Sequence, residues 1–326
     1  MHPTSSEGPL IQTVGLEKFF KVPKGTLKAV DGVDLSIMRG QTLGVVGESG
    51  CGKSTLGRTL LSILKPTGGK VLFHGQPIDT LGKAELRQFH RHAQIIFQDP
   101  YSSINPRMTV SETIMDPVIV SGAIKNRAER EAWVEKLMKI VGLSQRAYNA
   151  YPHELDGGRL QRVGIARALA LNPDFIVCDE PVSALDVSIQ AQILNLLMDL
   201  QDDMGLTYLF ITHDLSVVKH ISNDIMVMYL GKCVEYAPAK TLFDAPQHPY
   251  TKALLDAIPE PDLSVRDKYS NLLRGELTSP INPVPGCRFA ARCDSAMSQC
   301  NGEDIRNIAL GGGHSVMCRL FYGQGN

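Results

Sequence analysis

The sequence lacks the features of several classes of protein. Within its 326 residues no uninterrupted apolar run approaches the about 20 residues that a membrane-spanning helix needs. Its first residues, Met-His-Pro-Thr-Ser-Ser-Glu, contain neither a basic nor an apolar segment, so they predict no secretory signal. Basic and acidic residues nearly balance, 33 against 34, whereas duplex-binding proteins usually carry a basic excess. We therefore expect a cytoplasmic protein without nucleic acid as its main partner, which works at a membrane only through other subunits.

Zinc knuckles of the C-x2-C type are also missing, although the chain has seven cysteines. Four of them crowd into the C-terminal part, namely Cys287, Cys293, Cys300 and Cys318. In a cytoplasmic chain, clustered cysteines suggest metal binding more than disulfides. Four thiols suit Zn²⁺ or an iron–sulfur cluster, and the spacing alone is equally compatible with four free thiols in a small lobe.

Short apolar runs rich in β-formers alternate with longer amphipathic stretches. The expected strands are Leu43–Val46, Gln94–Phe97, Phe175–Cys178, Tyr208–Thr212 and Ile225–Tyr229. The expected helices are Ser54–Leu64, Arg127–Val141, Gly158–Ala170, Ser188–Met204 and Leu215–Ile221. Strands of this kind are buried on both faces of a largely parallel sheet, and their alternation with helices predicts an α/β fold.

The chain divides into a main domain and an extension. Residues from about 102 to 165 lack strand-like runs, which predicts a helical subdomain inserted in a main domain over residues 10–258. After Gln247 prolines accumulate and the regular pattern is lost. We therefore expect residues 259–326 to form a small, cysteine-containing extension.

The phosphate-binding loop, Gly47-Glu-Ser-Gly-Cys-Gly-Lys-Ser54, fits the pattern G-x-x-x-x-G-K-[ST]. It follows a strand-like run and begins a helix-like one, so this context favours a phosphate site over a glycine turn with an exposed lysine. Glycines permit positive φ, which turns successive N–H groups inward towards an anion. Lys53 is expected to reach the β- and γ-phosphates, and the Ser54 hydroxyl to coordinate Mg²⁺. The expected nucleotide contacts are Gly47, Ser49, Gly50, Cys51, Gly52, Lys53, Ser54 and Thr55.

Carboxylates follow another buried strand. In Phe175-Ile-Val-Cys-Asp-Glu-Pro181, Asp179 is placed to hold the Mg²⁺ shell and Glu180 to act as general base on water. Such a pair also caps helices, but the phosphate-binding loop makes catalysis the better interpretation. Gln98 and His213 also follow strands, at whose carboxyl ends ligands bind in doubly wound sheets. Gln98 is expected to contact the metal or water, and His213 the γ-phosphate, although each alone would be an ordinary loop residue.

With these motifs the chain resembles the nucleotide-binding subunits of ABC transporters over essentially its whole length. Tyr151-Pro-His-Glu-Leu-Asp-Gly-Gly-Arg-Leu-Gln-Arg-Val-Gly-Ile-Ala-Arg-Ala168 is similar to the ABC signature helix. Ser183-Ala-Leu-Asp186 resembles the D-loop, Gln98 the Q-loop and His213 the switch histidine. Phe20 stands where the family stacks an aromatic ring on adenine, although Phe19 is adjacent and a core role is equally possible. The resemblance adds Asp156, Gly157, Gly158, Arg159 and Asp186 to the expected ATP contacts.

Further segments resemble the dipeptide and oligopeptide importer ATPases, and most closely the second of their two ATPase subunits. These segments are Gln98–Pro106, Glu180–Ser188, His248-Pro-Tyr-Thr251 and the cysteine-bearing tail. The resemblance implies a head-to-tail dimer with a second homologous ATPase subunit, two transmembrane permease subunits and an extracytoplasmic peptide-binding protein. It places the chain peripherally on the cytoplasmic face of the inner membrane. It also implies a [4Fe–4S] cluster on the four tail cysteines.

The signature departs from the usual Ser-Gly-Gly-Gln of the family, because it reads Asp156-Gly-Gly-Arg159. An ionised Asp156 cannot donate a hydrogen bond to phosphate, and a carboxylate about 4 Å from one phosphate charge costs on the order of 4 kcal/mol at an effective dielectric of 20. Aspartate nevertheless caps a helix as serine does, and Arg159 is placed either to neutralise it or to reach the phosphate. We expect one weakened site in a heterodimer with unequal sites.

Two other functions compete with peptide import. Close relatives carry nickel, opines or glutathione, so another cargo is an alternative. A soluble ABC ATPase without a transport role is a second alternative, but such proteins commonly carry two cassettes or a long coiled-coil insertion, and neither is visible here.

Overall fold

The computed structural model describes residues 8–258 and 279–323, so the first 20 residues of the expected extension lie outside the described residues. The chain forms two compact units. Unit 1 comprises residues 1–37, 42–79 and 212–326, and unit 2 comprises residues 38–41 and 80–211. Within the described residues no helix is long and apolar enough to span a bilayer.

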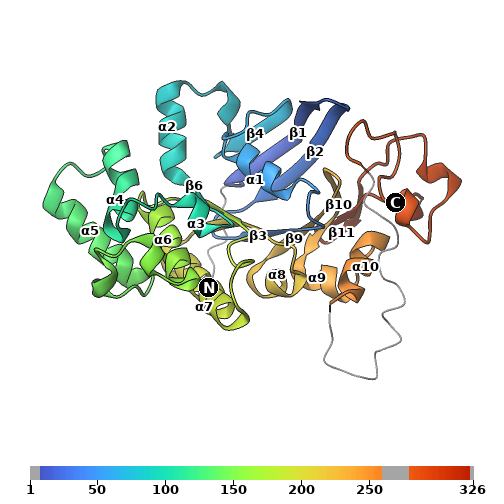
Figure 1. Ribbon diagram of the computed structural model, residues 1–326. Coiled ribbons are helices and arrows are strands. Elements are labelled where there is room, and N and C mark those ends of the chain that lie inside the picture. Colours follow the sequence, from blue (N-terminus) through green and yellow to red (C-terminus); the bar gives the residue numbers. More distant parts are fainter. Residues whose placement is uncertain (1–7, 259–278, 324–326) are drawn as a thin grey trace. The chain divides into compact units, whose positions relative to one another are not determined.

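Unit 1 contains an antiparallel sheet in the order β2-β1-β4-β5 (Figure 1). Its strands are β1 (Ile11–Val22), β2 (Gly25–Ile37), β4 (Gly68–Phe73) and β5 (Gln76–Pro77). The β1–β2 hairpin turns between Val22 and Gly25, which are paired across it, and Gly25 has φ +135°. Such a φ favours glycine, so the residue type fixes the position of the turn.

Further strands of unit 1 are arranged in the order β11-β12-β10-β9-β3. They are β3 (Thr42–Val46), β9 (Asp224–Tyr229), β10 (Lys232–Pro238), β11 (Ile308–Gly311) and β12 (His314–Val316). β3 and β9 are parallel, whereas β9, β10, β12 and β11 are antiparallel neighbours. The helices of this unit are α1 (Lys53–Leu60), α8 (Leu215–Ile221), α9 (Ala239–Asp244) and α10 (Pro249–Asp256).

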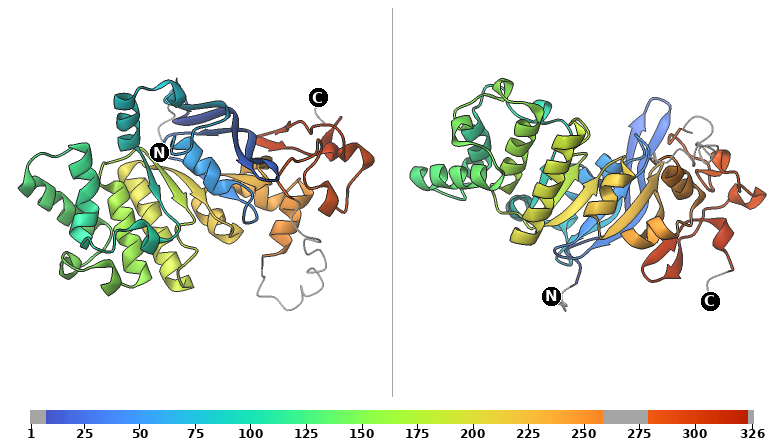
Figure 2. Two further views of the ribbon diagram at one scale, coloured as in Figure 1. Left: turned by 45° about the horizontal axis from the view of Figure 1, so that its top comes forward. Right: turned by 90° about the horizontal axis from the view of Figure 1, so that it is seen from below.

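Unit 2 has a parallel arrangement of strands in the order β8-β7-β6. Its helices are drawn mainly in green and yellow-green in Figure 2. The strands are β6 (Ala93–Ile96), β7 (Phe175–Asp179) and β8 (Thr207–Ile211). The helices are α2 (Lys83–His92), α3 (Pro100–Ser103), α4 (Val110–Ser121), α5 (Arg127–Ile140), α6 (Gly157–Leu169) and α7 (Val187–Met204). β7 and β8 are buried at every residue, as expected for strands covered on both faces.

The predicted α/β fold class is confirmed, and each predicted strand and helix is present within a few residues of its expected bounds. The five predicted strands pair only in parallel with one another in each unit. The prediction missed the antiparallel strands, namely β1, β2, β4, β5, β10, β11 and β12. Between β6 and β7 the described chain is helical, without strands, over the range expected for the inserted subdomain.

Candidate functional site

The phosphate-binding loop joins β3 to α1 through backbone geometry that only glycine adopts easily. Gly47 has φ +150°, Gly50 +78° and Gly52 +108°. A Cβ at Gly47 would overlap the carbonyl oxygen of Met228, and one at Gly52 would overlap that of Ala29. Gly52 is also the N-cap of α1, and no side chain caps that helix end. Uncapped N–H groups and the positive end of the helix dipole together favour an anionic ligand.

Lys53 occupies the first turn of α1 and is 4% exposed. Its ammonium group donates to the backbone carbonyls of Gly47 at 2.7 Å and Glu48 at 3.1 Å. The lysine therefore folds back over its own loop, and its buried charge is satisfied by carbonyl dipoles. Ser54 and Thr55 are half-buried beside it. Cys51 is buried within the loop, and this burial raises the pKa of its thiol.

Phe19 and Phe20 lie on β1, and their ring environments are similar. The ammonium of Lys18 stands 5.0 Å from the Phe20 ring centre, and that of Lys28 stands 5.2 Å from the Phe19 ring centre. Successive residues of a strand face opposite sides of a sheet, and both rings are half-buried. Neither burial nor charge therefore distinguishes the predicted adenine contact, Phe20, from its neighbour.

His213 lies in unit 1 immediately after Thr212 and is exposed. The next residue, Asp214, caps α8 by accepting from the Ser216 N–H group at 2.8 Å. The Thr212 hydroxyl accepts from the Asp214 N–H group at 3.0 Å. Two local bonds thus fix the backbone on the C-terminal side of the histidine.

In unit 2 the carboxyl end of β7 carries Asp179 and Glu180. Asp179 is 1% exposed, and Glu180 has φ +49°, an unusual conformation for a residue with a side chain. The Glu180 backbone is held at both ends, because its N–H donates to Ile211 at 3.0 Å and its carbonyl accepts from the Ser183 hydroxyl at 3.1 Å. Strained backbone of this kind often occurs at functional sites.

The side-chain amide of Gln98 donates to the Glu180 carboxylate at 2.8 Å. Two of the residues predicted to act together are therefore in contact, although 82 positions separate them in the sequence. Asp179 and Gln98 offer oxygen atoms, the donors that Mg²⁺ prefers, and the Ser54 hydroxyl in unit 1 is of the same kind.

The residues of the signature begin α6. Asp156 is the N-cap and accepts from the Arg159 N–H group at 2.8 Å. The two side chains also form an ion pair, with 3.3 Å between Asp156 Oδ2 and Arg159 Nε. Both side chains are mostly exposed, so this pair contributes little to stability. A Cβ at Gly158 would crowd the Ile189 side chain, while one at Gly157 would just touch Leu185.

Asp186 begins α7 in the same way. It is the N-cap and accepts from the Ile189 N–H group at 3.0 Å. Its carboxylate is therefore occupied by the helix end in this structure. Capping explains the residue type at this position without a nucleotide.

The four tail cysteines lie in the extension of unit 1 as free thiols. Burial raises the pKa of the Cys287 thiol to about 11, with smaller effects of Cys300, Cys318 and Cys293 in the same direction. Over residues 8–258 and 279–323, no group of three or more His, Cys, Asp or Glu side chains is arranged to hold a metal ion. The thiols are thus near neighbours, but in this structure they do not form a ligand set.

Two residues to which the sequence analysis assigned no role at this site complete the surroundings of the phosphate-binding loop. The Arg292 guanidinium binds the Glu48 carboxylate at 2.7 and 3.1 Å, and the Tyr250 hydroxyl accepts from the Glu48 N–H at 2.9 Å. No local pattern marks these contacts, since Arg292 is 244 positions from Glu48. The only sequence signal for Arg292 was its place beside Cys293 in the cysteine-bearing tail.

Two regions of the chain match known protein families, and the whole chain is similar to known transport proteins. Residues 30–183 match the family described as ABC transporter, and residues 234–300 match the C-terminal region of the oligopeptide/dipeptide transporter family. The chain is 50% identical to YkfD of Bacillus subtilis, named for oligopeptide transport, over 96% of both chains. It is 48% identical to the dipeptide transport ATP-binding protein DppF of Escherichia coli, over 90% of this chain and 89% of that protein.

A solved structure is similar as well. The dimeric ATP-binding cassette MJ0796 bound to ADP and phosphate is 31% identical, with a TM-score of 0.64, over 70% of this chain and 98% of that one.

Proposed function

Because the chain belongs to the family of ABC transporter ATP-binding proteins for oligopeptides and dipeptides, we propose that it powers peptide import as one of two unequal ATPase subunits. The names of YkfD and DppF support a peptide cargo. The phosphate-binding loop carries the proposal on the structural side, since it combines three glycines of positive φ, an uncapped helix start and a buried lysine.

In the proposed mechanism the phosphate-binding loop holds the ATP phosphates. Lys53 keeps its two carbonyl partners, which orient the ammonium, and directs its third N–H to phosphate oxygens, which bind it strongly because they are charged acceptors. The N–H groups from Gly50 to Thr55 surround the same phosphates, and Phe20 stacks on adenine. Bound Mg²⁺ neutralises charge on the phosphates. Ser54, Asp179 and Gln98 are the residues that would hold it.

Glu180 is the proposed general base. Its carboxylate, oriented by Gln98, takes a proton from the attacking water, and His213 donates to the γ-phosphate. In the assembled dimer the residues Asp156 to Arg159 and Asp186 would face the nucleotide of the partner subunit.

A Lys53→Ala variant tests the assignment of this site directly. We expect it to lose ATP binding, measured by titration of the full chain with a fluorescent ATP analogue. Equal affinity in Lys53→Ala and the wild type would contradict the proposal.

The unequal sites follow from the signature residues. The Asp156 carboxylate already accepts from the backbone and pairs with Arg159, so it offers no hydroxyl to a phosphate. The site that uses the signature of this chain is therefore the weaker one, while the site that uses Lys53 and Glu180 depends on the signature of the partner. Unequal sites fit a heterodimer better than a homodimer, because a homodimer would carry the defect in both of its sites.

Restoring the usual residues tests the inequality. In the assembled complex the variant Asp156→Ser/Arg159→Gln should hydrolyse ATP faster than the wild type, with both proteins compared at saturating ATP. An unchanged or lower rate would count against unequal sites.

The proposed partners are a second ATPase subunit, two transmembrane permease subunits and an extracytoplasmic peptide-binding protein. The chain would then sit peripherally at the cytoplasmic face of the inner membrane. Purification of the intact complex, with mass spectrometry of its subunits and bound ligand, tests the partners and the cargo together. Nickel, an opine or glutathione in place of peptide would identify the importer as a different member of the group, and a complex without permeases would favour a soluble ATPase.

A [4Fe–4S] cluster on Cys287, Cys293, Cys300 and Cys318 is proposed as a stabilising element of the extension. Four thiols in one lobe, three of which have other thiols among the causes of their raised pKa values, support it. Since these thiols form no ligand set here, cluster binding would require them to draw together, and no step of the ATPase mechanism depends on it. A colourless, iron-free protein after purification without oxygen would contradict it.

A further inference from the structure

An ion pair joins the extension to the phosphate-binding loop. Arg292 directs both terminal nitrogens at the Glu48 carboxylate, from Nη1 at 2.7 Å and from Nη2 at 3.1 Å. The arginine side chain is only 5% exposed and that of Glu48 is 22% exposed. Hydrogen bonding to Glu48 is the main cause that raises the pKa of the Arg292 guanidinium. A two-pronged, mostly buried pair fixes both position and orientation, unlike a surface pair.

Glu48 is the residue of the loop at which three contacts meet. Its N–H donates to the Tyr250 hydroxyl on α10, its carbonyl accepts from Lys53, and its carboxylate is held by Arg292. A displacement of the Glu48 side chain would therefore also move the carbonyl that orients the lysine ammonium.

The segment that carries Arg292 is itself fixed. Phe289, 3% exposed, packs against Tyr229 and Tyr250 with 5.3 Å between ring centres in each pair. Arg288 binds the carbonyl of Leu230 and the buried carboxylate of Asp31. Such aromatic and charged anchors hold a short segment in one place.

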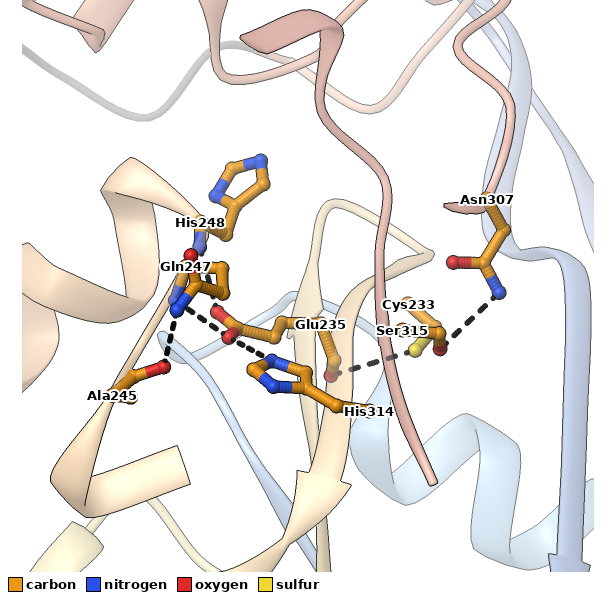
Figure 3. A network of polar contacts seen from close by, with 8 residues as sticks. All are labelled: Cys233, Glu235, Ala245, Gln247, His248, Asn307, His314 and Ser315. Carbon is orange, nitrogen blue, oxygen red and sulfur yellow. Dashed lines mark hydrogen bonds and ion pairs between the residues drawn. The ribbon is translucent and has the colours of Figure 1, made fainter. Parts of the chain in front are cut away.

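Deeper in unit 1 the extension is fastened by a buried carboxylate (Figure 3). Glu235 on β10 accepts from His314 on β12 at 2.8 Å, and from the N–H groups of Gln247 at 2.7 Å and His248 at 2.8 Å. β12 also pairs with β10 through Val316 opposite Glu235. The extension is thus joined to the strands and helices around it, and not only to the loop.

A further contact reaches the β1–β2 hairpin, which carries Phe20. The Asn282 side chain accepts from the Thr26 N–H group at 2.8 Å and donates to the Lys24 carbonyl at 3.1 Å. The extension therefore touches two of the elements to which nucleotide contacts are assigned.

We propose that Arg292 is a positioning residue for ATP binding: its guanidinium holds Glu48, and through Glu48 the loop carbonyl that orients Lys53. The extension thereby sets the affinity of the ATPase for nucleotide. This inference rests on the proposed role of Lys53 in binding phosphate. Arg292 acts through Glu48 and does not itself contact the phosphates.

Arg292→Gln removes the positive charge and one prong of the contact while keeping a polar side chain of similar length. We expect the Kd for ATP of the full chain, measured with a fluorescent analogue, to rise about tenfold. In the assembled complex the KM for ATP should rise by a similar factor, whereas kcat should change less than twofold. Arg292→Lys, which keeps the charge but loses the two-pronged geometry, should show a rise of about threefold.

A double-mutant cycle separates a role through Glu48 from a general role in folding. Glu48→Ala alone should also raise the Kd about tenfold, because Arg292 then has nothing to hold. If the two residues act together, the double variant Glu48→Ala/Arg292→Gln stays near tenfold. A rise of about a hundredfold in the double variant would mean independent roles and would overturn the proposal.

Arg306→Gln is the matched control, since it removes the same charge from an exposed position of the extension, and its Kd should equal that of the wild type. Unchanged affinity in both Arg292→Gln and Arg292→Lys overturns the positioning role. If Lys53→Ala still abolishes binding in that case, the proposed function stands and only this inference fails. If Lys53→Ala binds normally, the assignment of the nucleotide site itself fails.

Discussion

The amide of Gln98 and the carboxylate of Glu180 are joined by a hydrogen bond of 2.8 Å between Nε2 and Oε2. Gln98 follows β6 and Glu180 follows β7, and these two strands are parallel neighbours in unit 2. The bond fixes the orientation of the carboxylate. This arrangement suits a base that must be oriented while it accepts a proton.

Glu180→Gln should therefore lose hydrolysis while keeping nucleotide binding. Replacing the carboxylate by an amide removes the proton acceptor but preserves the shape of the side chain. We expect kcat to fall by about 10²–10⁴-fold, with the Kd for ATP within about threefold of the wild type. Single-turnover hydrolysis by the assembled complex, together with equilibrium binding, measures the two quantities separately.

Gln98→Glu is the companion variant, because it places a second carboxylate within hydrogen-bond distance of Glu180 and so penalises the ionised base. Its pH–rate profile should shift relative to that of the wild type. A Glu180→Gln complex that hydrolyses ATP at the wild-type rate would show that Glu180 is not the base.

Substitution by alanine should have different effects on ATP binding and stability at Gly50 and at Gly52 of the phosphate-binding loop. Gly50 and Gly52 both have positive φ, so a Cβ strains either one by roughly 1–2 kcal/mol. Only at Gly52 would the new Cβ also overlap a backbone atom, the carbonyl oxygen of Ala29, whereas the space around Gly50 is open. We expect Gly52→Ala to weaken ATP binding more than tenfold and to lower Tm by several degrees.

Gly50→Ala is the control for backbone strain without overlap. Its Tm should lie between those of the wild type and Gly52→Ala. Thermal unfolding and nucleotide titration of both variants give the comparison. Equal losses in the two variants would mean that contact with β2, on which Ala29 lies, does not constrain the loop.

The sequence predicted those parts of the fold and site that rest on local patterns. Short buried strands such as Phe175–Asp179 are apolar at nearly every position, and the glycines of the phosphate-binding loop have a fixed spacing around Lys53. The β1–β2 hairpin was missed, because bulges near Leu16 and between Lys18 and Phe19 interrupt the alternation that marks a half-buried strand.

Contacts between distant residues could not be predicted in the same way. Asn282 and Thr26 are 256 positions apart, and Arg292 and Glu48 are 244 apart. The residues around Arg292 in the sequence do not indicate which carboxylate it binds, because ion pairing depends on which surfaces the whole fold brings together. The partner of Glu180 was predictable only in part: strand ends suggested that Gln98 was near, but the direct bond between them was not predicted.

His248 gives a prediction about acid stability. It is 1% exposed, and burial lowers its pKa to about 3, compared with about 6.5 in an unfolded chain. Its Nδ1 accepts from the Tyr250 N–H group at 3.0 Å and caps α10, and the charged group bonded to its backbone is Glu235. Between these two pKa values the unfolded chain binds a proton that the folded chain does not, so stability falls as the pH drops from about 6.5 towards 3.

The contribution of one such proton is about 1.4 kcal/mol per pH unit at 25 °C. His248→Asn keeps an acceptor for the helix cap but cannot be protonated, so its free energy of unfolding should fall less steeply with acid by about that slope. Urea unfolding at intervals between pH 6.5 and 4.5 measures both slopes, and His220→Asn, at an exposed position of α8, should follow the wild type. Parallel slopes for His248→Asn and the wild type would mean that the ring takes up a proton as readily in the folded chain as in the unfolded chain. Burial would then not lower the pKa of His248, and the prediction would be wrong.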